Sequence, residues 1–418
     1  MLIRIVCAAL LAMLPAAAEE QGISVQEILS EALARNPEIL AAQKRVEGMR
    51  QKPYAEQALP DPMVSLGWNS SGNPLPGAGL GSEPTANIGL MVSQEIPYPG
   101  KRALRSKVVQ KEAEAEFQTY LATQLRIVSQ VKQVFFDYHH AYESADILRR
   151  NRSVLTQILE MTQARYTAGK AMQQDLFKLQ TQLSLMEVRI QQFEREKTIK
   201  RAELNMLRSR APDTPMAAPI LFMKHEMPSD VESLYRAAEA NAPVLKREQK
   251  MIERAESAVN LARKNYYPDT TVNAGYFNMG SMPPMYMFRV DVKVPFYLKR
   301  QRAEVTEQVQ GVAEARHRFE AADQSMHFRI RENFTMAETA LKIIHLYENT
   351  VMPQARLAVE SGLTTYSTGG ADFASVFMNY QSLVEAELSY HEEMASFLMA
   401  LSRLEELTGM ELVAGGGK

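Results

Sequence analysis

The sequence predicts a mainly α-helical chain with a β-barrel part, built from two tandem copies of one unit. Four short segments alternate apolar and polar residues, as strands do when one face borders lipid and the other borders water. Two helical runs of about 64 residues are far longer than the helices of an ordinary domain. Several motifs of the first half recur about 200 residues later.

The N-terminus resembles a secretory signal. Arg4 precedes an apolar run over residues 5–14, and three alanines follow at 16–18, which predicts a signal peptide over residues 1–18. Cys7 lies inside this run and is the single cysteine of the chain. The exported chain is therefore expected to have no disulfide, no thiol chemistry and no zinc site built on cysteine.

Composition narrows the function further. The formal net charge is −2, from 47 basic and 49 acidic residues spread along the chain, which predicts no nucleic-acid partner. After the signal, no apolar stretch approaches the roughly 20 residues that a membrane-spanning helix needs, so any crossing must use strands. No catalytic motif or phosphate-binding loop is present, and we expect neither an enzyme nor a cofactor.

Three motifs establish the repeat. LPDPMVSLGW (residues 59–68) matches YPDTTVNAGY (267–276) at a spacing of 208. IPYPGKR (96–102) matches VPFYLKR (294–300) at a spacing of 198, and RYTAGKA (165–171) matches TYSTGGA (365–371) at a spacing of 200. Because 208 − 198 = 10, the loop between the paired strands is ten residues shorter in the second copy.

Each copy is expected to contain a helix, two strands, a long helix, a glycine turn and a further helix. The first copy, residues 19–209, is predicted to have a helix over 24–57, strands at 62–69 and 86–96, a helix over 101–164, a turn at 167–170 and a helix to 208. A proline-rich linker over 210–228 joins it to the second copy, residues 229–410. There we predict a helix over 229–266, strands at 270–277 and 285–294, a helix over 299–363, a turn at 367–370, a helix over 372–409, and a flexible tail over 411–418.

The fourth strand has the clearest alternation. Apolar residues at 286, 288, 290, 292 and 294 alternate with Met287, Arg289, Asp291 and Lys293. The three ionic side chains are expected to face a water-filled barrel lumen. Taken alone, this segment fits a strand of a soluble sheet equally well. Four strands cannot close a barrel, because roughly eight is the smallest number that does, so several copies of the chain must share one barrel.

The long helices show coiled-coil spacing. Leu121, Val128, Phe135 and Tyr142 lie seven residues apart, with Val131 and Tyr138 between them. Charged residues and glutamines lie between such positions, as in residues 191–204. A single packed core would not tolerate so many charges, so we expect a hollow helical tube with water on both sides.

In this order and spacing, the motifs resemble those of the TolC-like outer membrane efflux family. The resemblance covers nearly the whole mature chain and depends on QEIPYPGKR (94–102), RYTAGKAMQQD (165–175) and TYSTGGADF (365–373). It implies a homotrimer with a 12-stranded transmembrane β-barrel in the outer membrane of a Gram-negative cell. It also implies a coiled-coil α-barrel in the periplasm, with the linker 210–228 in an equatorial belt. The implied function is a passive exit duct joined through a periplasmic adaptor to an inner-membrane pump of the RND type.

The resemblance also implies roles at the periplasmic tips. Tyr166, Gly169, Asp175, Tyr366 and Gly369 match positions that contact the adaptor or lie at the closed aperture. The glycines are expected to take positive φ or to allow close contact, although an ordinary helix turn with a capping Asp explains the glycines equally well.

At the aperture itself the chain departs from the family pattern. Ser375 and Met378 stand where the best-studied aperture has acidic residues, and Ala371 stands where a basic residue is expected. Closure is therefore expected to depend on packing and hydrogen bonds more than on charge.

The cargo is predicted from the motif at 96–102 and from methionines. IPYPGKR resembles the form found in the heavy-metal branch of the family, and thioethers are soft ligands that suit Cu(I) and Ag(I). Candidate ligands are Met279, Met282, Met285 and Met287 in the loop before the fourth strand, and Met223, His225 and Met227 in the linker. Methionine also fills gaps in apolar packing, so a purely structural role stays open.

Other functions remain open at this stage. The same duct can serve drugs, other small molecules or type I protein secretion. A different class, a periplasmic coiled-coil adaptor or scaffold that never crosses a membrane, also fits the long helices. His139 and His140 are adjacent on a helix and point about 100° apart, so both cannot bind one ion from one face.

Overall fold

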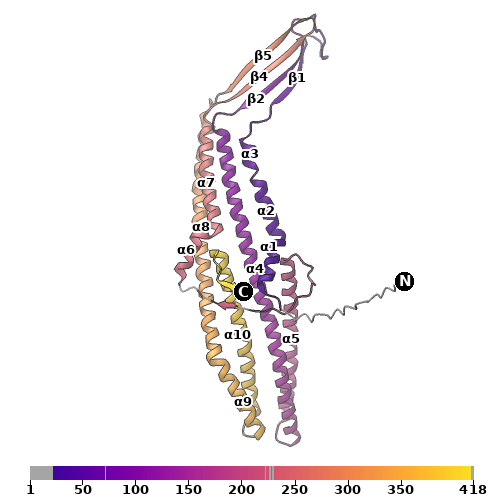
Figure 1. Cartoon of the computed structure of the whole chain (residues 1–418), viewed down its shortest axis with the longest axis vertical. Helices are drawn as coiled ribbons and strands as arrows, with labels where there is room; N and C mark the ends of the chain where they lie inside the picture. The colour runs from indigo at the N-terminus through magenta and orange to yellow at the C-terminus, as the bar shows by residue number, and fades with distance from the viewer. Residues whose placement is uncertain (1–21, 71, 222, 226, 228–229, 416–418) are drawn as a thin grey trace, which may run out of the picture.

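The computed structural model describes residues 22–415 except 71, 222, 226, 228 and 229, so the predicted signal peptide lies outside the described residues. The molecule is a long rod with a β-sheet at one end and two helical hairpin tips at the other (Figure 1). Mainly helical structure with a small antiparallel sheet confirms the predicted fold class.

The first half has the element order helix, strand pair, long helical hairpin. Its elements are α1 (Val25–Arg35), α2 (Pro37–Met49), α3 (Lys52–Gln57), β1 (Met63–Asn69), β2 (Asn87–Ile96), α4 (Lys101–Thr167) and α5 (Gln173–Leu207). The second half repeats this order with α6 (Val231–Asn241), α7 (Pro243–Lys264), β4 (Asp269–Met279), β5 (Met282–Lys293), α8 (Leu298–Leu346), the π-helix η1 (Tyr347–Val351), α9 (Met352–Thr368) and α10 (Phe373–Thr408).

The main sheet has four antiparallel strands in the order β1-β2-β4-β5, so each copy contributes one hairpin and β1 and β5 are its edges. The register aligns apolar residues in rows across one face: Leu66 lies opposite Leu90, Leu90 opposite Tyr276, and Tyr276 opposite Tyr286. This apolar face is solvent-exposed in the single chain, with Phe288 at 74% exposure. The pattern is that of a sheet whose apolar face has no partner within the protomer.

The fourth strand begins earlier than the sequence indicates, at Met282 instead of residue 285. It includes Pro283 and Pro284, which lack an N–H group and are tolerated because β5 is an edge strand. Only residues 280 and 281 separate it from β4, and Gly280 has the positive φ (74°) that a two-residue hairpin requires. The expectation that the four methionines occupy a loop is therefore wrong, since all of them lie on strands.

The helices expected at 24–57 and 229–266 are broken by proline. Pro37 occupies the first turn of α2, and the side chain of Asn36 caps that helix by accepting the N–H of Glu38 at 2.9 Å. Pro243 begins α7 in the same way after α6. A proline in the middle of a helix removes a hydrogen bond and disfavours the helical conformation of the preceding residue, so each run divides there.

The long helices match their predicted residue ranges more closely. α4 runs without interruption for 67 residues. The run expected at 299–363 is divided, because the π-helix Tyr347–Val351 separates α8 from α9 just before Pro353. No helix among the described residues combines the length and the apolar character needed to cross a membrane.

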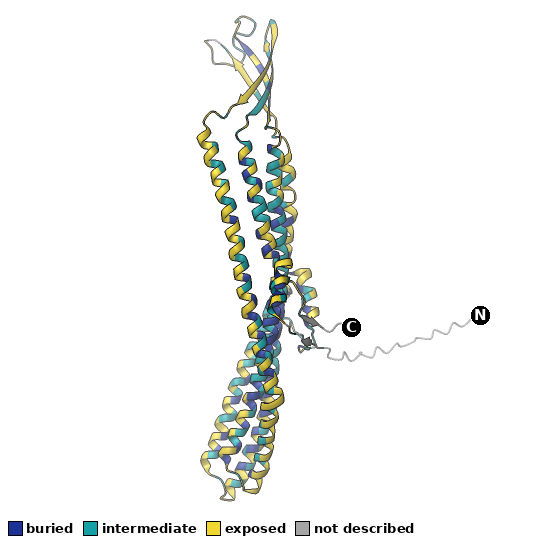
Figure 2. Cartoon of the chain, turned by 90° about the vertical axis from the view of Figure 1, so that its left-hand side faces the viewer, coloured by how far each residue is buried: buried dark blue, intermediate teal, exposed yellow. Residues whose placement is uncertain are grey.

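Two clusters of buried apolar side chains hold the helices together. One lies around the middle of the rod and joins α1, α4, α6, α8 and α10, and it contains the predicted coiled-coil residues Val131, Phe135 and Tyr138. The other lies toward the tips, between α4, α5, α9 and α10. Figure 2 shows these buried positions along the inner sides of the helices, with exposed residues over much of the remaining surface.

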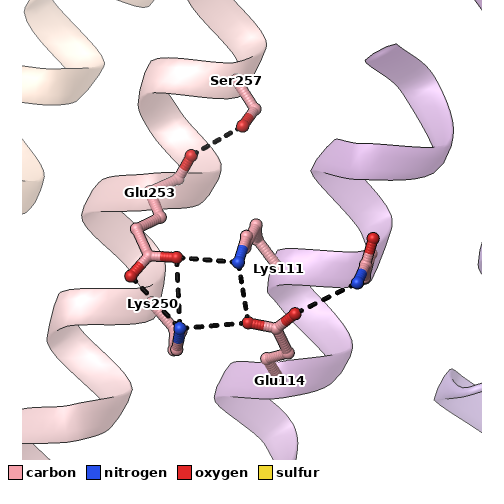
Figure 3. Close-up of polar contacts among 6 residues, drawn as sticks. Lys111, Glu114, Lys250, Glu253 and Ser257 are labelled. Carbon is pink, nitrogen blue, oxygen red and sulfur yellow. Dashed lines mark hydrogen bonds and ion pairs between the residues drawn. The ribbon is translucent and has the colours of Figure 1, made fainter. Parts of the chain in front are cut away.

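Ion pairs join the two repeats along the rod. Lys111 and Glu114 of α4 and Lys250 and Glu253 of α7 form a closed set of four contacts of 2.8 to 3.2 Å (Figure 3). The hydrogen bond from Lys111 lowers the pKa of Glu253 below its ordinary value. These charges keep α4 and α7 in register between the main core and the sheet.

The linker and the C-terminal segment meet near the middle of the rod. β3 (Met223–His225) pairs with β6 (Val413–Gly415) in a two-stranded antiparallel sheet. Residues 413–415 are thus a paired strand and not a flexible tail as expected, because their backbone groups find partners in the linker.

Candidate functional site

The two tips end in the same backbone motif. Gly169 has φ of 68° and Gly369 has φ of 90°, as expected for left-handed caps. At the first tip, the N–H of Lys170 donates to the carbonyl of Arg165 at 2.8 Å, and the N–H of Gly370 makes the corresponding bond at the second tip at 2.9 Å. Glycine avoids the Cβ penalty of this conformation, so each sequence terminates its helix at a defined residue.

The second tip is fastened to the first by Tyr366. Its side chain is only 2% exposed, and its hydroxyl lies 3.1 Å from Oγ1 of Thr162 on α4. Thr162 donates its own proton to the carbonyl of Ile158, so Tyr366 must be the donor to Thr162. Arg165 lies over the Tyr366 ring at 4.4 Å from its centroid and donates Nη1 to the Tyr366 carbonyl oxygen. These contacts link the helical hairpins of the two repeats.

The remaining predicted tip residues differ in exposure. Tyr166 and Met378 are exposed, the latter at 65%. Asp175 is partly exposed and accepts the N–H of Met172 at 3.3 Å, so it has the capping role considered above. Ser375 is exposed and donates its N–H to Asp372 at 3.0 Å.

Sequence reasoning missed three tip residues. Arg165 is the first residue of the recognised motif and Thr162 lies just before it, but only their contacts with Tyr366 about 200 residues away reveal their role. Asp372 is an acidic residue directly after the second glycine turn, and its hydrogen bonds with Ser375 lower the pKa of its carboxyl. A carboxylate is therefore present near this tip, although it caps α10.

The second face of the sheet has a polar network. Oγ of Ser93 donates to Oδ1 of Asn273 at 2.6 Å, and Nδ2 of Asn273 donates to Asp291 at 2.7 Å. Arg289 donates Nε to the same carboxylate at 3.1 Å. Lys293 lies on this face by alternation along β5 and is exposed. The three predicted lumen residues thus share one face, opposite the apolar rows.

The candidate metal ligands do not form one cluster. Met279 lies opposite Met282 at the end of the β4–β5 hairpin, and Met285 and Met287 alternate onto the polar face with Arg289. Met227 packs against the main core.

Met223 and His225 lie in β3, and their side chains are outside the described residues. Across the part of the chain that the structure describes, no three His, Cys, Asp or Glu residues are grouped as a metal site.

Phe277 covers two glycines on the polar face of the sheet. A Cβ built on Gly89 would lie 2.0 Å from Cδ1 of Phe277, and one built on Gly275 would lie 2.8 Å from Cε2. The ring therefore lies directly on the backbone of two neighbouring strands, an arrangement that only glycine allows.

His139 is not arranged as a ligand. Burial, and to a smaller extent the neighbouring His140, lowers its pKa from 6.5 to about 4, so it is neutral at physiological pH. Its closest charged neighbour is Glu143, 4.0 Å away on the same helix. This histidine is a half-buried residue of α4.

Comparisons with known proteins agree with this geometry. Residues 28–209 match the family described as outer membrane efflux protein. No curated protein sequence matches the chain.

Three solved structures with a similar fold are an outer membrane protein and two proteins described as channels. CusC is 15% identical with a TM-score of 0.79, covering 92% of this chain and 91% of that chain. VceC of Vibrio cholerae is 16% identical with a TM-score of 0.77, covering 92% and 96%. MtrE of Neisseria gonorrhoeae, in its open state, is 16% identical with a TM-score of 0.77, covering 92% and 88%. At these identities the likeness establishes the fold.

A rod with a strand-bearing end and two helical tips is the fold that this chain shares with these structures. Residues 28–209 match the outer membrane efflux protein family, and the fold of the whole length resembles that of CusC. The family matched over residues 28–209 is one of outer membrane efflux proteins, which connects this chain with efflux across the outer membrane. The match and the shared fold favour this class over a periplasmic adaptor or scaffold.

Proposed function

We propose that three copies of this chain form one exit duct, with their 12 strands closing a barrel in the outer membrane and their helices forming a tube in the periplasm. The open edges of β1 and β5 and the exposed apolar face of the sheet support this assembly. In lipid, every backbone polar group needs a partner, so a four-stranded sheet with two free edges is incomplete. The duct takes its cargo from a periplasmic adaptor and an RND-type inner-membrane pump.

Within this duct, the polar face of the sheet lines the lumen. Arg289, Asp291 and Lys293 then contact water, and the bonds from Arg289 and Asn273 hold Asp291 in place. The opposite face contacts lipid through residues such as Phe288. This orientation is supported by hydrophobicity alone, because it is the one that keeps the charges out of hydrocarbon.

The tips contact the adaptor and form the aperture. Tyr166 and Met378 are the exposed candidates for contact, and the turns at Gly169 and Gly369 present backbone without a side chain. Asp175 and Ser375 lie near the starts of α5 and α10 and belong to the same predicted contact set. Tyr366 is buried and contributes through its contact with Thr162 inside the protomer. Closure then depends mainly on the buried contacts of Tyr366.

The proposed cargo is a heavy-metal ion such as copper or silver. Its support is the motif at 96–102 and the placement of Met285 and Met287 on the same sheet face as the charged residues. Thioethers along the lumen offer weak sites for Cu(I) or Ag(I), and weak binding lets an ion leave. Drugs, other small molecules or a secreted protein are the alternative cargo.

Deleting the gene tests both the duct and its cargo. We expect the deletion strain to lose tolerance of copper and silver, and complementation to restore it. Unchanged metal tolerance with new sensitivity to organic drugs would contradict the metal proposal and favour a drug duct. Recovery of the protein as a heat-modifiable trimer from outer membrane fractions is expected, and recovery as a soluble periplasmic monomer would refute the duct.

Replacing methionines separates sulfur chemistry from packing. Met285→Leu with Met287→Leu keeps a similar apolar volume but removes both thioethers. We expect lower copper tolerance with unchanged trimer yield. The matched control is Met279→Leu with Met282→Leu at the hairpin end, which is expected to have the smaller effect because these residues lie beyond the register shift after Phe277.

A further inference from the structure

A charged clamp holds the first repeat to the second where the sheet meets the helices. Lys101, at the start of α4, has a side chain only 4% exposed and donates Nζ to both oxygens of Asp269 at 2.9 Å and to the carbonyl of Tyr267 at 3.1 Å. The N–H of Tyr98 donates to Oδ1 of Asp269 at 2.8 Å. The rings of Tyr98 and Tyr267 stack at 4.5 Å, with Lys264 over both. This clamp fixes β2 against β4.

The repeat offsets predict strand register within this chain. Shifting β1 by 208 residues gives β4, and shifting β2 by 198 gives β5. The pair Leu66 and Leu90 in the first hairpin then becomes Ala274 and Phe288, which are paired in the second hairpin. Both hairpins therefore have the same register. The offsets thus relate residues that occupy equivalent places in the two repeats of the fold.

The same offsets find an unformed counterpart of the clamp. Lys101 becomes Lys299 at the start of α8, and Asp269 becomes Asp61 just before β1. Both side chains are exposed, and neither has a hydrogen bond or an ion pair to any residue that the structure describes. Asp61 lies just before the edge strand β1 and Lys299 lies after the edge strand β5, so they are brought together only when another copy of the chain supplies the facing edge.

The apolar part of the clamp has a counterpart too. The stacked rings of Tyr98 and Tyr267 correspond to Phe296 and Leu59. Phe296 is 85% exposed and Leu59 is 46% exposed in the single chain. Large apolar side chains left in this state indicate a surface that is covered in the assembly.

We propose that β5 of one copy pairs antiparallel with β1 of the next, with Val292 opposite Val64, and that Lys299 binds Asp61 of the neighbouring copy. In the β2–β4 junction, Gln94 lies opposite Val272. Adding 198 to position 94 gives Val292, and subtracting 208 from position 272 gives Val64, which sets the register. This inference rests on the proposed shared barrel and specifies its interface.

The proposed register continues both faces of the sheet across the boundary between copies. Phe288 lies opposite Trp68 on the apolar face, and Asp291 lies opposite Ser65 on the polar face. A shift by one residue would instead direct the apolar set of one strand to the polar side. The pairing thus places apolar residues beside apolar residues on one face and polar residues beside polar residues on the other.

Cysteine pairs test the register, because the single native cysteine lies in the predicted signal peptide. We expect Val64→Cys with Val292→Cys to give covalent dimers and trimers after mild oxidation, since directly opposite residues have Cα atoms about 4.5–5.5 Å apart. The matched control, Val64→Cys with Val290→Cys, is displaced by two residues to about 7–8 Å and should crosslink far less. Preferential crosslinking of the control pair in an intact trimer would overturn the register alone. A chain that stays monomeric in detergent would refute the shared barrel itself.

Charge reversal tests the clamp without new cysteines. We expect Lys299→Glu and Asp61→Lys each to lower the temperature at which the trimer dissociates on heating in detergent. The double variant should recover most of the loss, because the pair is restored with opposite polarity. Additive losses in the double variant, or single variants that dissociate like the native trimer, would overturn the ion pair.

Discussion

The contacts of Tyr366 at the tip give a graded prediction for two substitutions. Tyr366→Phe removes one donor, while Thr162 keeps its bond to the Ile158 carbonyl. Arg165→Ala removes a charged donor to the Tyr366 carbonyl and the cation over the ring. The arginine variant should therefore loosen the tip more than the phenylalanine variant.

The magnitudes follow from the kind of bond lost. A buried hydrogen bond between neutral groups contributes about 1 kcal/mol, so Tyr366→Phe should favour local opening by roughly 5-fold. A hydrogen bond from a charged group contributes about 1.5–3 kcal/mol, and the cation above the ring adds about 1 kcal/mol. Arg165→Ala should thus favour opening on the order of 100-fold.

Hydrogen exchange at the turns measures this opening directly. The amides of Lys170 and Gly370 are hydrogen-bonded in the closed turns, and their exchange should accelerate in the order native, Tyr366→Phe, Arg165→Ala. Arg165→Lys is the control, because it keeps the charge but loses the planar fork, and it should fall between the two variants. Faster exchange in Tyr366→Phe than in Arg165→Ala would refute this account of the tip.

Three further predictions concern stability. Between pH 6.5 and about 4, the unfolded chain binds a proton at His139 that the folded chain does not. The free energy of unfolding should therefore fall by about 3 kcal/mol as the pH is lowered through this range. A thermal unfolding series at several pH values should show a smaller fall for His139→Gln. Lys132→Met leaves the buried carboxylate of Glu405 without its 2.6 Å ion pair, so the free energy of unfolding should fall by about 3–5 kcal/mol. Adding Glu405→Leu should recover most of this loss. Equal losses in the single and double variants would contradict this expectation. Gly89→Ala should reduce the yield of folded sheet by colliding with Phe277, and Phe277→Ala in the same chain should restore it; a folded yield like the native one in Gly89→Ala would argue against this contact.

The repeat and the strands were accessible from sequence because their signals are local. Alternation with period two and recurrence at fixed spacing need no knowledge of distant contacts, and β1 and β2 begin within one residue of the expected positions. The helix breaks were visible only as Pro37 and Pro243, because the apolar periodicity resumes on both sides of each proline. The early start of β5 was hidden by two prolines that an edge strand tolerates.

The tip contacts could not be predicted in the same way. The burial of Tyr366 depends on Thr162 and Arg165, which lie about 200 residues earlier in the chain. Spacing within one motif identifies the glycine turn but not which side chain of the other repeat packs against it. For the same reason, the sequence did not separate exposed Tyr166 from buried Tyr366, although both occupy the same place in their motifs.

The π-helix Tyr347–Val351 lies in a helical run that is two residues longer than its counterpart in the first copy. From Lys101 to Gly169 the first copy advances 68 residues, whereas from Lys299 to Gly369 the second advances 70. Two extra residues would lengthen a regular helix by about 3 Å and rotate everything below them by about 200°. A π-turn holds one residue more than an α-turn, so it takes up part of this excess locally. The π-helix thus accommodates part of the difference in length between the two copies, and both hairpins still end level with each other (Figure 1).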